Sequence, residues 1–131
     1  MEAGIKGYSE LEVVFENTAK ALGSGLVEVF ATPAMIALME NTAAESIMPY
    51  LEEGLGSVGT KLNVTHDAAT PIGMTVRCES TLVEVDGRRL VFTVEAFDDA
   101  GKIGAGTHER FIIQTDKFLA KVNAKKAAAG K

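Results

Sequence analysis

Two side chains of this sequence are suited to proton transfer and lie where such groups are uncommon. Glu40 lies inside an apolar stretch, directly after Met39. His66 closes a segment of alternating apolar and polar residues, on the same predicted face as Val58, Leu62 and Val64 and opposite the face of Ser57. A carboxylate that loses hydration among apolar neighbours is a candidate base or nucleophile, and imidazole titrates near neutral pH. If both face one interior, they could act together in general acid–base catalysis.

Each of these residues also has a structural interpretation. Glu40 could share the exposed side of a helix with Asn41 or Glu45, and an inward His66 could be a core residue with its hydrogen bonds satisfied. The other histidine, His108, lies in a segment whose two faces both mix polar and apolar residues. Periodicity therefore leaves catalysis and structure open for all three residues.

Thr32 is the third candidate, because it precedes a predicted helix. We expect it to be the N-cap, with Pro33 as the first helical residue. A helix N-terminus carries unpaired N–H groups and a positive dipole, which can hold a carbonyl oxygen as it becomes an oxyanion. Glu40 follows about 12 Å along the axis at 1.5 Å per residue, and its side chain leans back toward Thr32.

The elements that must position these residues follow from periodicity and turn residues. From Ala34 to Pro49 the chain is apolar on most sides, which predicts a buried central helix. Asp86-Gly87 indicates a hairpin, and Thr115 could cap a short amphipathic helix. The predicted strands are residues 10–15, 58–67, 74–85, 88–97 and 102–114. We therefore predict an α+β fold of the hot-dog type, a long central helix wrapped by an antiparallel sheet of about five strands.

Composition limits the possible functions. The 131 residues suffice for a single domain, 1–131, whose segment 115–131 is a C-terminal helix and basic tail. The net charge of -5 argues against nucleic-acid binding, although five lysines after residue 116 could form a local basic patch or a solvated helix face. No phosphate-binding or zinc-binding motif occurs, so we expect no cofactor and no metal.

Cysteine usage and hydropathy predict the cellular setting. A lone cysteine, Cys78, excludes an intrachain disulfide framework and is expected to be buried and inert. The N-terminal residues lack the apolar core of a signal peptide, and no apolar run approaches the ~20 residues that span a bilayer. We expect a cytoplasmic protein with no membrane segment.

Collinear motifs give the chain a resemblance to a known family. In order along the sequence they are 29–32 (VFAT), 38–40 (LME), 49–52 (PYLE), 56–60 (GSVGT), 64–66 (VTH), 68–71 (AATP), 85–90 (VDGRRL) and 103–110 (IGAGTHER). This set, covering about residues 29–126, resembles the fluoroacetyl-CoA thioesterases of the hot-dog fold. Their order along most of the chain is more specific than any one of them.

The resemblance implies an acyl-CoA thioesterase with Thr32, Glu40 and His66 at its active site. Glu40 would attack the thioester carbonyl or activate a water, while His66 would assist proton transfer and Thr32 would orient the carboxylate and substrate. Gly59 and Arg110 match substrate-site residues of the family. Differences at residues 33–34 and 41–42 set the chain apart from the fluoroacetyl-specific pattern, so a broader acyl-CoA thioesterase is expected.

The resemblance also implies a homodimer with active sites at the interface, which would cover an open sheet edge. Two other functions remain to be weighed. A hot-dog protein could bind acyl-CoA or another small acid without turnover, but such a protein would not need both Glu40 and His66. A hot-dog dehydratase or hydratase would also use a histidine and an acid, although the collinear motifs favour the thioesterases.

Overall fold

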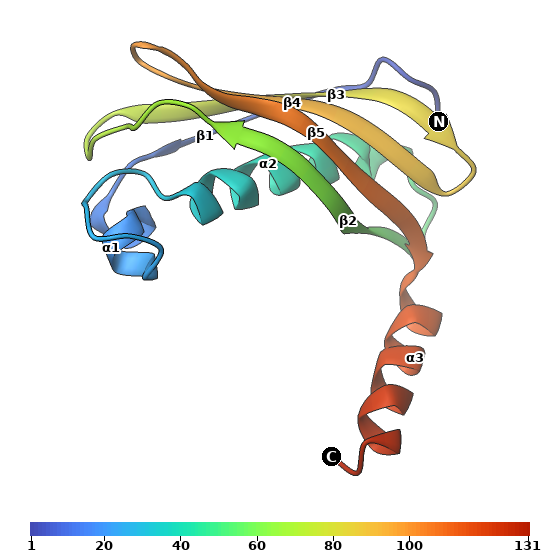
Figure 1. The fold of residues 1–131 in the computed structure, drawn as a ribbon. Helices are drawn as coiled ribbons and strands as arrows, with labels where there is room; N and C mark the ends of the chain where they lie inside the picture. The colour runs from blue at the N-terminus through green and yellow to red at the C-terminus, as the bar shows by residue number, and fades with distance from the viewer.

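A five-stranded antiparallel sheet curves around one long helix in this computed structural model, which describes all residues from Met1 to Lys131 (Figure 1). The strands lie in the order β1-β3-β4-β5-β2, so β1 and β2 are the two edges. The predicted α+β architecture is confirmed. The strand bounds are β1 Lys6–Glu12, β2 Leu55–His66, β3 Thr75–Asp86, β4 Arg89–Asp98 and β5 Gly101–Gln114.

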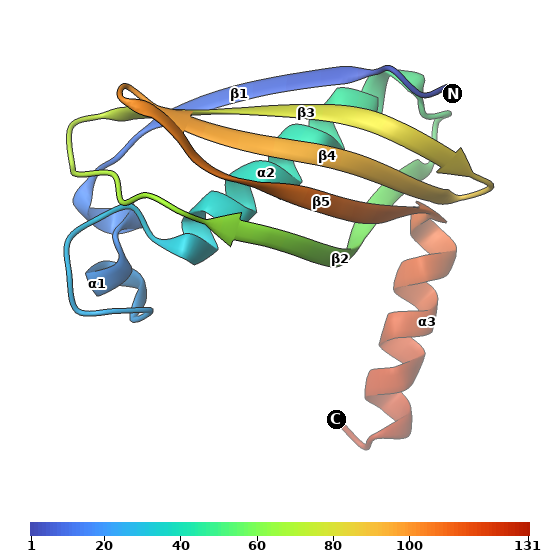
Figure 2. The ribbon, with the colours of Figure 1, turned by 45° about the horizontal axis from the view of Figure 1, so that its top comes forward.

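The central helix, α2 (Thr32–Ile47), lies across one face of the sheet (Figure 2). Ala31 is its N-cap and Thr32 its first residue, so the prediction that Thr32 caps the helix is wrong by one position. The carbonyl of Ala31 accepts the first helical hydrogen bond, from the Met35 N–H at 3.0 Å. This shift frees the Thr32 hydroxyl for a contact outside the helix.

The other helices are short or stand apart. They are η1 (Phe15–Asn17), α1 (Ala19–Leu22), η2 (Met48–Tyr50) and α3 (Thr115–Ala128). The predicted C-terminal helix is confirmed, although Gln114 rather than Thr115 is its N-cap, and it projects away from the sheet at the end of β5 (Figures 1 and 2). None of the helices is long and apolar enough to cross a bilayer.

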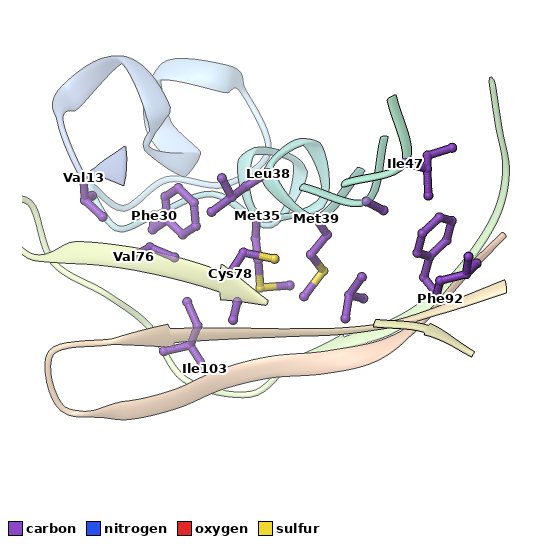
Figure 3. Packing of buried hydrophobic residues seen from close by; sticks show 14 of the residues in the cluster. Val13, Phe30, Met35, Leu38, Met39, Ile47, Val76, Cys78, Phe92 and Ile103 are labelled. Atoms are coloured by element: carbon purple, nitrogen blue, oxygen red, sulfur yellow. The ribbon is translucent and has the colours of Figure 1, made fainter. Parts of the chain in front are cut away.

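The core fills the space between α2 and the concave face of the sheet (Figure 3). Met35, Met39 and Ile47 of α2 are completely buried, and so are Cys78 and Phe92 from the sheet. One side of α2 is exposed, so the prediction of a buried central helix holds for its other sides only. The exposed side carries an alanine and polar residues. These residues do not interrupt the helical pattern of the sequence, but they give that side little apolar surface to bury.

The first strand begins earlier than the apolar pattern predicts, at Lys6 rather than at residue 10. Its inward residues include Gly7 and Ser9, which are too small to register as an apolar alternation. Gly7 is small because a Cβ there would lie 2.8 Å from the Ser46 Cβ of α2. Close approach of helix and strand therefore dictates this part of the sequence.

A bulge in β2 changes which residues face α2. The register of β2 against β5 shifts between Gly59 and Lys61. Before the shift Gly59 faces the helix, whereas after it Leu62 and His66 do. The predicted grouping of Val58 with Leu62 on one face is therefore wrong, because an extra residue reverses the alternation.

Candidate active site

Thr32 and His66 form the first part of the site, where α2 begins and β2 ends. The Thr32 Oγ1 lies 2.7 Å from the His66 Nδ1. Both residues line a pocket of about 270 Å³ together with residues from the segment before α2 and the loop after β2. The bulge places His66 on the helix side of the sheet, and the helix start at Thr32 turns the hydroxyl toward it. Two of the three predicted catalytic residues thus meet at a pocket.

His66 is held in a neutral state that suits proton transfer. Burial lowers its pKa below the usual 6.5, and the charge of neighbouring Asp67 opposes that shift. Its Nε2 is buried without a hydrogen-bond partner. A neutral imidazole has one N–H and one lone pair, so His66 engages Thr32 through Nδ1 while its buried Nε2 stays unpaired in the protomer.

Glu40 lies with Arg110 and Gly59 in a second cluster. The Glu40 Oε2 is 3.6 Å from the Arg110 Nη1, and the Glu40 side chain is 39% exposed while that of Arg110 is 8% exposed. A Cβ on Gly59 would lie 2.6 Å from the same Glu40 oxygen. Gly59 therefore leaves the room that the carboxylate occupies, which is why the pattern of β2 is interrupted by a residue without a side chain.

The protomer does not bring Glu40 to the Thr32–His66 pair. Thr32 and Glu40 are eight residues apart on one helix, about 12 Å along its axis. Gly59 and His66, which mark the two clusters on the sheet, both belong to the edge strand β2. The predicted site residues thus form two clusters along the same edge of the sheet.

Sequence patterns missed two residues that hold Arg110. The Arg110 Nε donates to the Ser57 Oγ at 2.8 Å, and its Nη2 donates to the Ser57 carbonyl at 2.9 Å. His108 is fully buried, with its Nε2 3.2 Å from the Arg110 Nη1. The spacing of His108 and Arg110, two apart on a strand, could have indicated a shared face. Ser57 was assigned to the wrong face because the bulge was not foreseen.

The fold and these clusters define a class of protein, the hot-dog thioesterases. The chain superimposes on the solved fluoroacetyl-CoA thioesterase FlK with a TM-score of 0.90 and 43% identity, covering 95% of this chain and 97% of that one. It matches TTHA0967 of Thermus thermophilus, described as a thioesterase superfamily member, with a TM-score of 0.91 and 30% identity over 98% of this chain and 96% of that one.

Sequence comparison narrows the class to a family. A family profile described as fluoroacetyl-CoA-specific thioesterase matches residues 13–116. The curated fluoroacetyl-CoA thioesterase of Streptantibioticus cattleyicolor is 52% identical over 101 residues, which are 77% of this chain and 73% of that protein. The chain belongs to this thioesterase family and is a thioester hydrolase, so the predicted family, hot-dog fold and enzyme class are confirmed.

Proposed function

We propose that the enzyme hydrolyses a small acyl-CoA thioester to the free acid and CoA, with Thr32, Glu40 and His66 as its catalytic residues. The observation that carries this proposal is the 2.7 Å contact between Thr32 and His66 at the pocket. A pocket of about 270 Å³ is below the usual size for drug-like ligands and suits a short acyl group. The similarity to proteins named for fluoroacetyl-CoA supports the same substrate class.

Each residue has a defined part in this reaction. Hydrolysis breaks the thioester C–S bond, the carbonyl carbon gains an oxygen that comes from water, and the departing sulfur gains a proton. Glu40 either removes a proton from the attacking water or attacks the carbonyl itself, in which case water then hydrolyses the mixed anhydride and restores the carboxylate. Neutral His66 accepts a proton of the attacking water through its lone pair and passes it to the leaving sulfur. The Thr32 hydroxyl orients His66, beside the unpaired N–H groups that open α2 and can hold the carbonyl oxygen.

We also propose that a homodimer completes each site, with Glu40 of one protomer serving the Thr32–His66 pair of the other. A separation of about 12 Å along α2 is too long for one small thioester to contact both clusters in one protomer. Both clusters border β2, whose outer edge pairs with nothing in the protomer. A twofold axis across that edge would place the two β2 strands antiparallel and bring each carboxylate toward the opposite pair.

Surfaces that stay unpaired or exposed in the protomer support the dimer. An edge strand of 12 residues exposes unpaired N–H and C=O groups that another strand can cover. The projecting α3 leaves Phe118, Leu119 and Val122 between 36% and 50% exposed. The helix that carries them begins at the end of the sheet where β5 meets β2, so the same association could cover them.

The first test is free-thiol release from short-chain, medium-chain, aryl and fluoroacetyl-CoA thioesters. We expect turnover of at least one short substrate, and a loss of about 100-fold in Glu40→Gln and in His66→Ala, the scale of general acid–base catalysis. Glu45→Gln is the matched control, because Glu45 is an exposed carboxylate on the same helix. Binding without turnover in every protein would instead identify a binding module.

Mixed dimers test which protomer supplies the Glu40 carboxylate to each site. His66→Ala and Glu40→Gln proteins each keep only about 1% of wild-type activity separately, but a heterodimer would pair one intact hydroxyl–imidazole cluster with one intact carboxylate. After unfolding and refolding an equal mixture, we expect roughly a quarter of wild-type activity, from half of the dimers with one working site each. No recovery, with the mixture shown to be dimeric by light scattering, would assign all three residues to one protomer. A monomer would refute the dimer itself.

A cytoplasmic location is proposed as well. The only cysteine, Cys78, is a buried free thiol in the core, which fits a compartment where thiols stay reduced. Fractionation of the producing cells, with activity measured in each fraction, tests this location directly. Recovery of the activity mainly outside the cytoplasmic fraction would refute it.

A further inference from the structure

His108 is a buried ionisable residue to which the reaction described above gives no part. It lies in the middle of β5, opposite Leu62 of β2 and Phe92 of β4, and it is inaccessible to solvent. Its ring stacks on Phe92 with centroids 6.1 Å apart. A histidine in such a place must have its ring nitrogens satisfied, because a buried polar group without a partner is costly.

The partners of the two ring nitrogens fix where the proton lies. The His108 Nε2 is 3.2 Å from the Arg110 Nη1, and the His108 Nδ1 is 2.9 Å from the Lys61 carbonyl oxygen. A guanidinium can only donate and a carbonyl can only accept. His108 is therefore neutral, with its proton on Nδ1 and a lone pair on Nε2 directed at Arg110.

This lone pair completes the set of contacts that orient Arg110. Two of the guanidinium nitrogens donate to Ser57, and the third, Nη1, lies between the His108 Nε2 and the Glu40 Oε2. A Cβ on Gly59 would lie 3.2 Å from the His108 Cε1 and 3.3 Å from the Arg110 Nη1. Imidazole, guanidinium and carboxylate thus share the space that Gly59 leaves open.

We propose that His108 is a positioning residue: by accepting a hydrogen bond from Arg110, it keeps the guanidinium where it holds the Glu40 carboxylate over Gly59. This inference rests on the proposed catalytic part of Glu40. The groups around His108 agree with a neutral acceptor. Burial and the positive charge of Arg110 lower the pKa of His108 below 6.5, against the Lys61 carbonyl and the charges of Glu40 and Glu109.

Two substitutions separate positioning from simple filling of the core. His108→Phe keeps an aromatic ring against Phe92 but offers Arg110 no acceptor, and His108→Gln restores a carbonyl oxygen near the position of Nε2. We expect kcat to fall about ten-fold in the Phe variant, the loss expected for one hydrogen bond, with KM little changed. The Gln variant should recover most of that loss. Val94→Ala, a core truncation on β4 away from Arg110, should lower Tm while kcat stays the same.

A double-mutant cycle tests the route through Arg110. If His108 acts only by orienting the guanidinium, His108→Phe has no further effect on kcat in an Arg110→Ala background. An equal loss in both backgrounds overturns the inference, as does wild-type kcat in His108→Phe. Full activity in Glu40→Gln and Arg110→Ala would instead refute the proposed catalytic site itself.

The tautomer can be measured without any substitution, which matters if the Phe variant fails to fold. Nitrogen-15 NMR of the imidazole distinguishes a ring protonated at Nδ1 from one protonated at Nε2. We expect the signals of the fully buried ring to show Nδ1–H and an unprotonated Nε2 at pH 7. Protonation at Nε2, in either the neutral or the charged ring, would remove the acceptor and overturn the inference.

Discussion

The two clusters of the candidate site differ in how far a single protomer completes them. Around Glu40, the guanidinium of Arg110 has a partner at each nitrogen, and Gly59 leaves a space shaped for the carboxylate. Around Thr32 and His66, one hydrogen bond defines the pair, and the His66 Nε2 has no partner. The chain fixes the guanidinium beside its carboxylate but leaves one nitrogen of the hydroxyl–imidazole pair without a partner.

This difference shows that two clusters along one sheet edge can have different parts in catalysis. The Glu40 carboxylate faces one cation, the Arg110 guanidinium at 3.6 Å, and contacts to Ser57 of the neighbouring strand hold that guanidinium in place, as preorganised electrostatic stabilisation requires. A proton carrier must instead reach a substrate that comes and goes, so a nitrogen without a protein partner is an advantage there. We refer to Glu40, Gly59 and Arg110 as the fixed cluster and to Thr32 and His66 as the open cluster.

The largest effect is expected from adding one methyl group at Gly59. The Cβ of Gly59→Ala would lie 2.6 Å from the Glu40 Oε2, so the carboxylate must move. Because a misplacement of about 1 Å can cost 100-fold in rate, we expect kcat to fall by about that factor. The same Cβ would lie 3.2 Å from the buried His108 Cε1 and 3.3 Å from the Arg110 Nη1, so Tm should fall as well.

The control for this substitution is Gly56→Ala in the same strand. A Cβ there would meet the Thr115 Oγ1 at 3.3 Å and nothing of the site. Its kcat should equal that of the wild type. Equal losses in the two variants would show that β2 tolerates no added methyl group, and the special part assigned to Gly59 would be wrong.

The sequence was informative about the helix, the hairpins and the open cluster. The capping pattern before Pro33 placed the start of α2 within one residue, and the alternation before His66 placed the imidazole on the correct face. The turn at Asp86-Gly87 was also found, although the structure pairs Asp86 with Arg89 and turns at the two residues between them. These features depend on local residue preferences, which are visible in a sequence.

The fixed cluster was harder to predict because it depends on contacts between distant strands. A single extra residue in β2 reverses the faces of Ser57 and Val58, and nothing local marks that bulge apart from a glycine. The buried position of His108 likewise follows from the packing of β5 between two neighbours. The link from Gly59 and Arg110 to the site came from family resemblance rather than from periodicity.

A smaller effect is expected from the hydroxyl of the open cluster. Thr32→Val keeps the shape of the side chain but removes the hydrogen bond to the His66 Nδ1. We expect kcat/KM to fall about ten-fold, the scale of one hydrogen bond, whereas Thr32→Ser should stay near wild type. Steady-state kinetics on the best short acyl-CoA checks both. Equal activity of the Val and Ser variants would show that the hydroxyl does not matter.

The open cluster should also respond to acid. Protonating His66 removes the lone pair that its catalytic part needs, and burial lowers its pKa, so kcat/KM should fall with a midpoint below 6.5. Stability should fall in the same direction. The unfolded chain binds protons at its histidines near pH 6.5, while the buried His66 and His108 bind them only at lower pH.

Thermal unfolding and kinetics between pH 7.5 and 5.5 check this prediction together. Tm should decline as the pH falls below 6.5, and the residual activity of His66→Gln should lose its dependence on pH in this range. A flat Tm over the whole range would mean that neither histidine is perturbed by burial. An unchanged activity profile in the variant would assign the acid response to another group.

The smallest effect is expected on the opposite face of the strand that carries the fixed cluster. Glu109 lies between His108 and Arg110 in sequence but makes ion pairs with Arg89 at 2.8 Å and Lys61 at 3.8 Å, on the other side of the sheet. Ion pairs whose cations reach solvent contribute little, and Lys61 and Arg89 are 66% and 37% exposed, so Glu109→Gln should shift Tm by less than about 4 °C and leave kcat unchanged. A large loss of kcat would mean that charge on either side of β5 affects the carboxylate. The fixed cluster would then be tuned by the strand as a whole rather than by the contacts of Arg110.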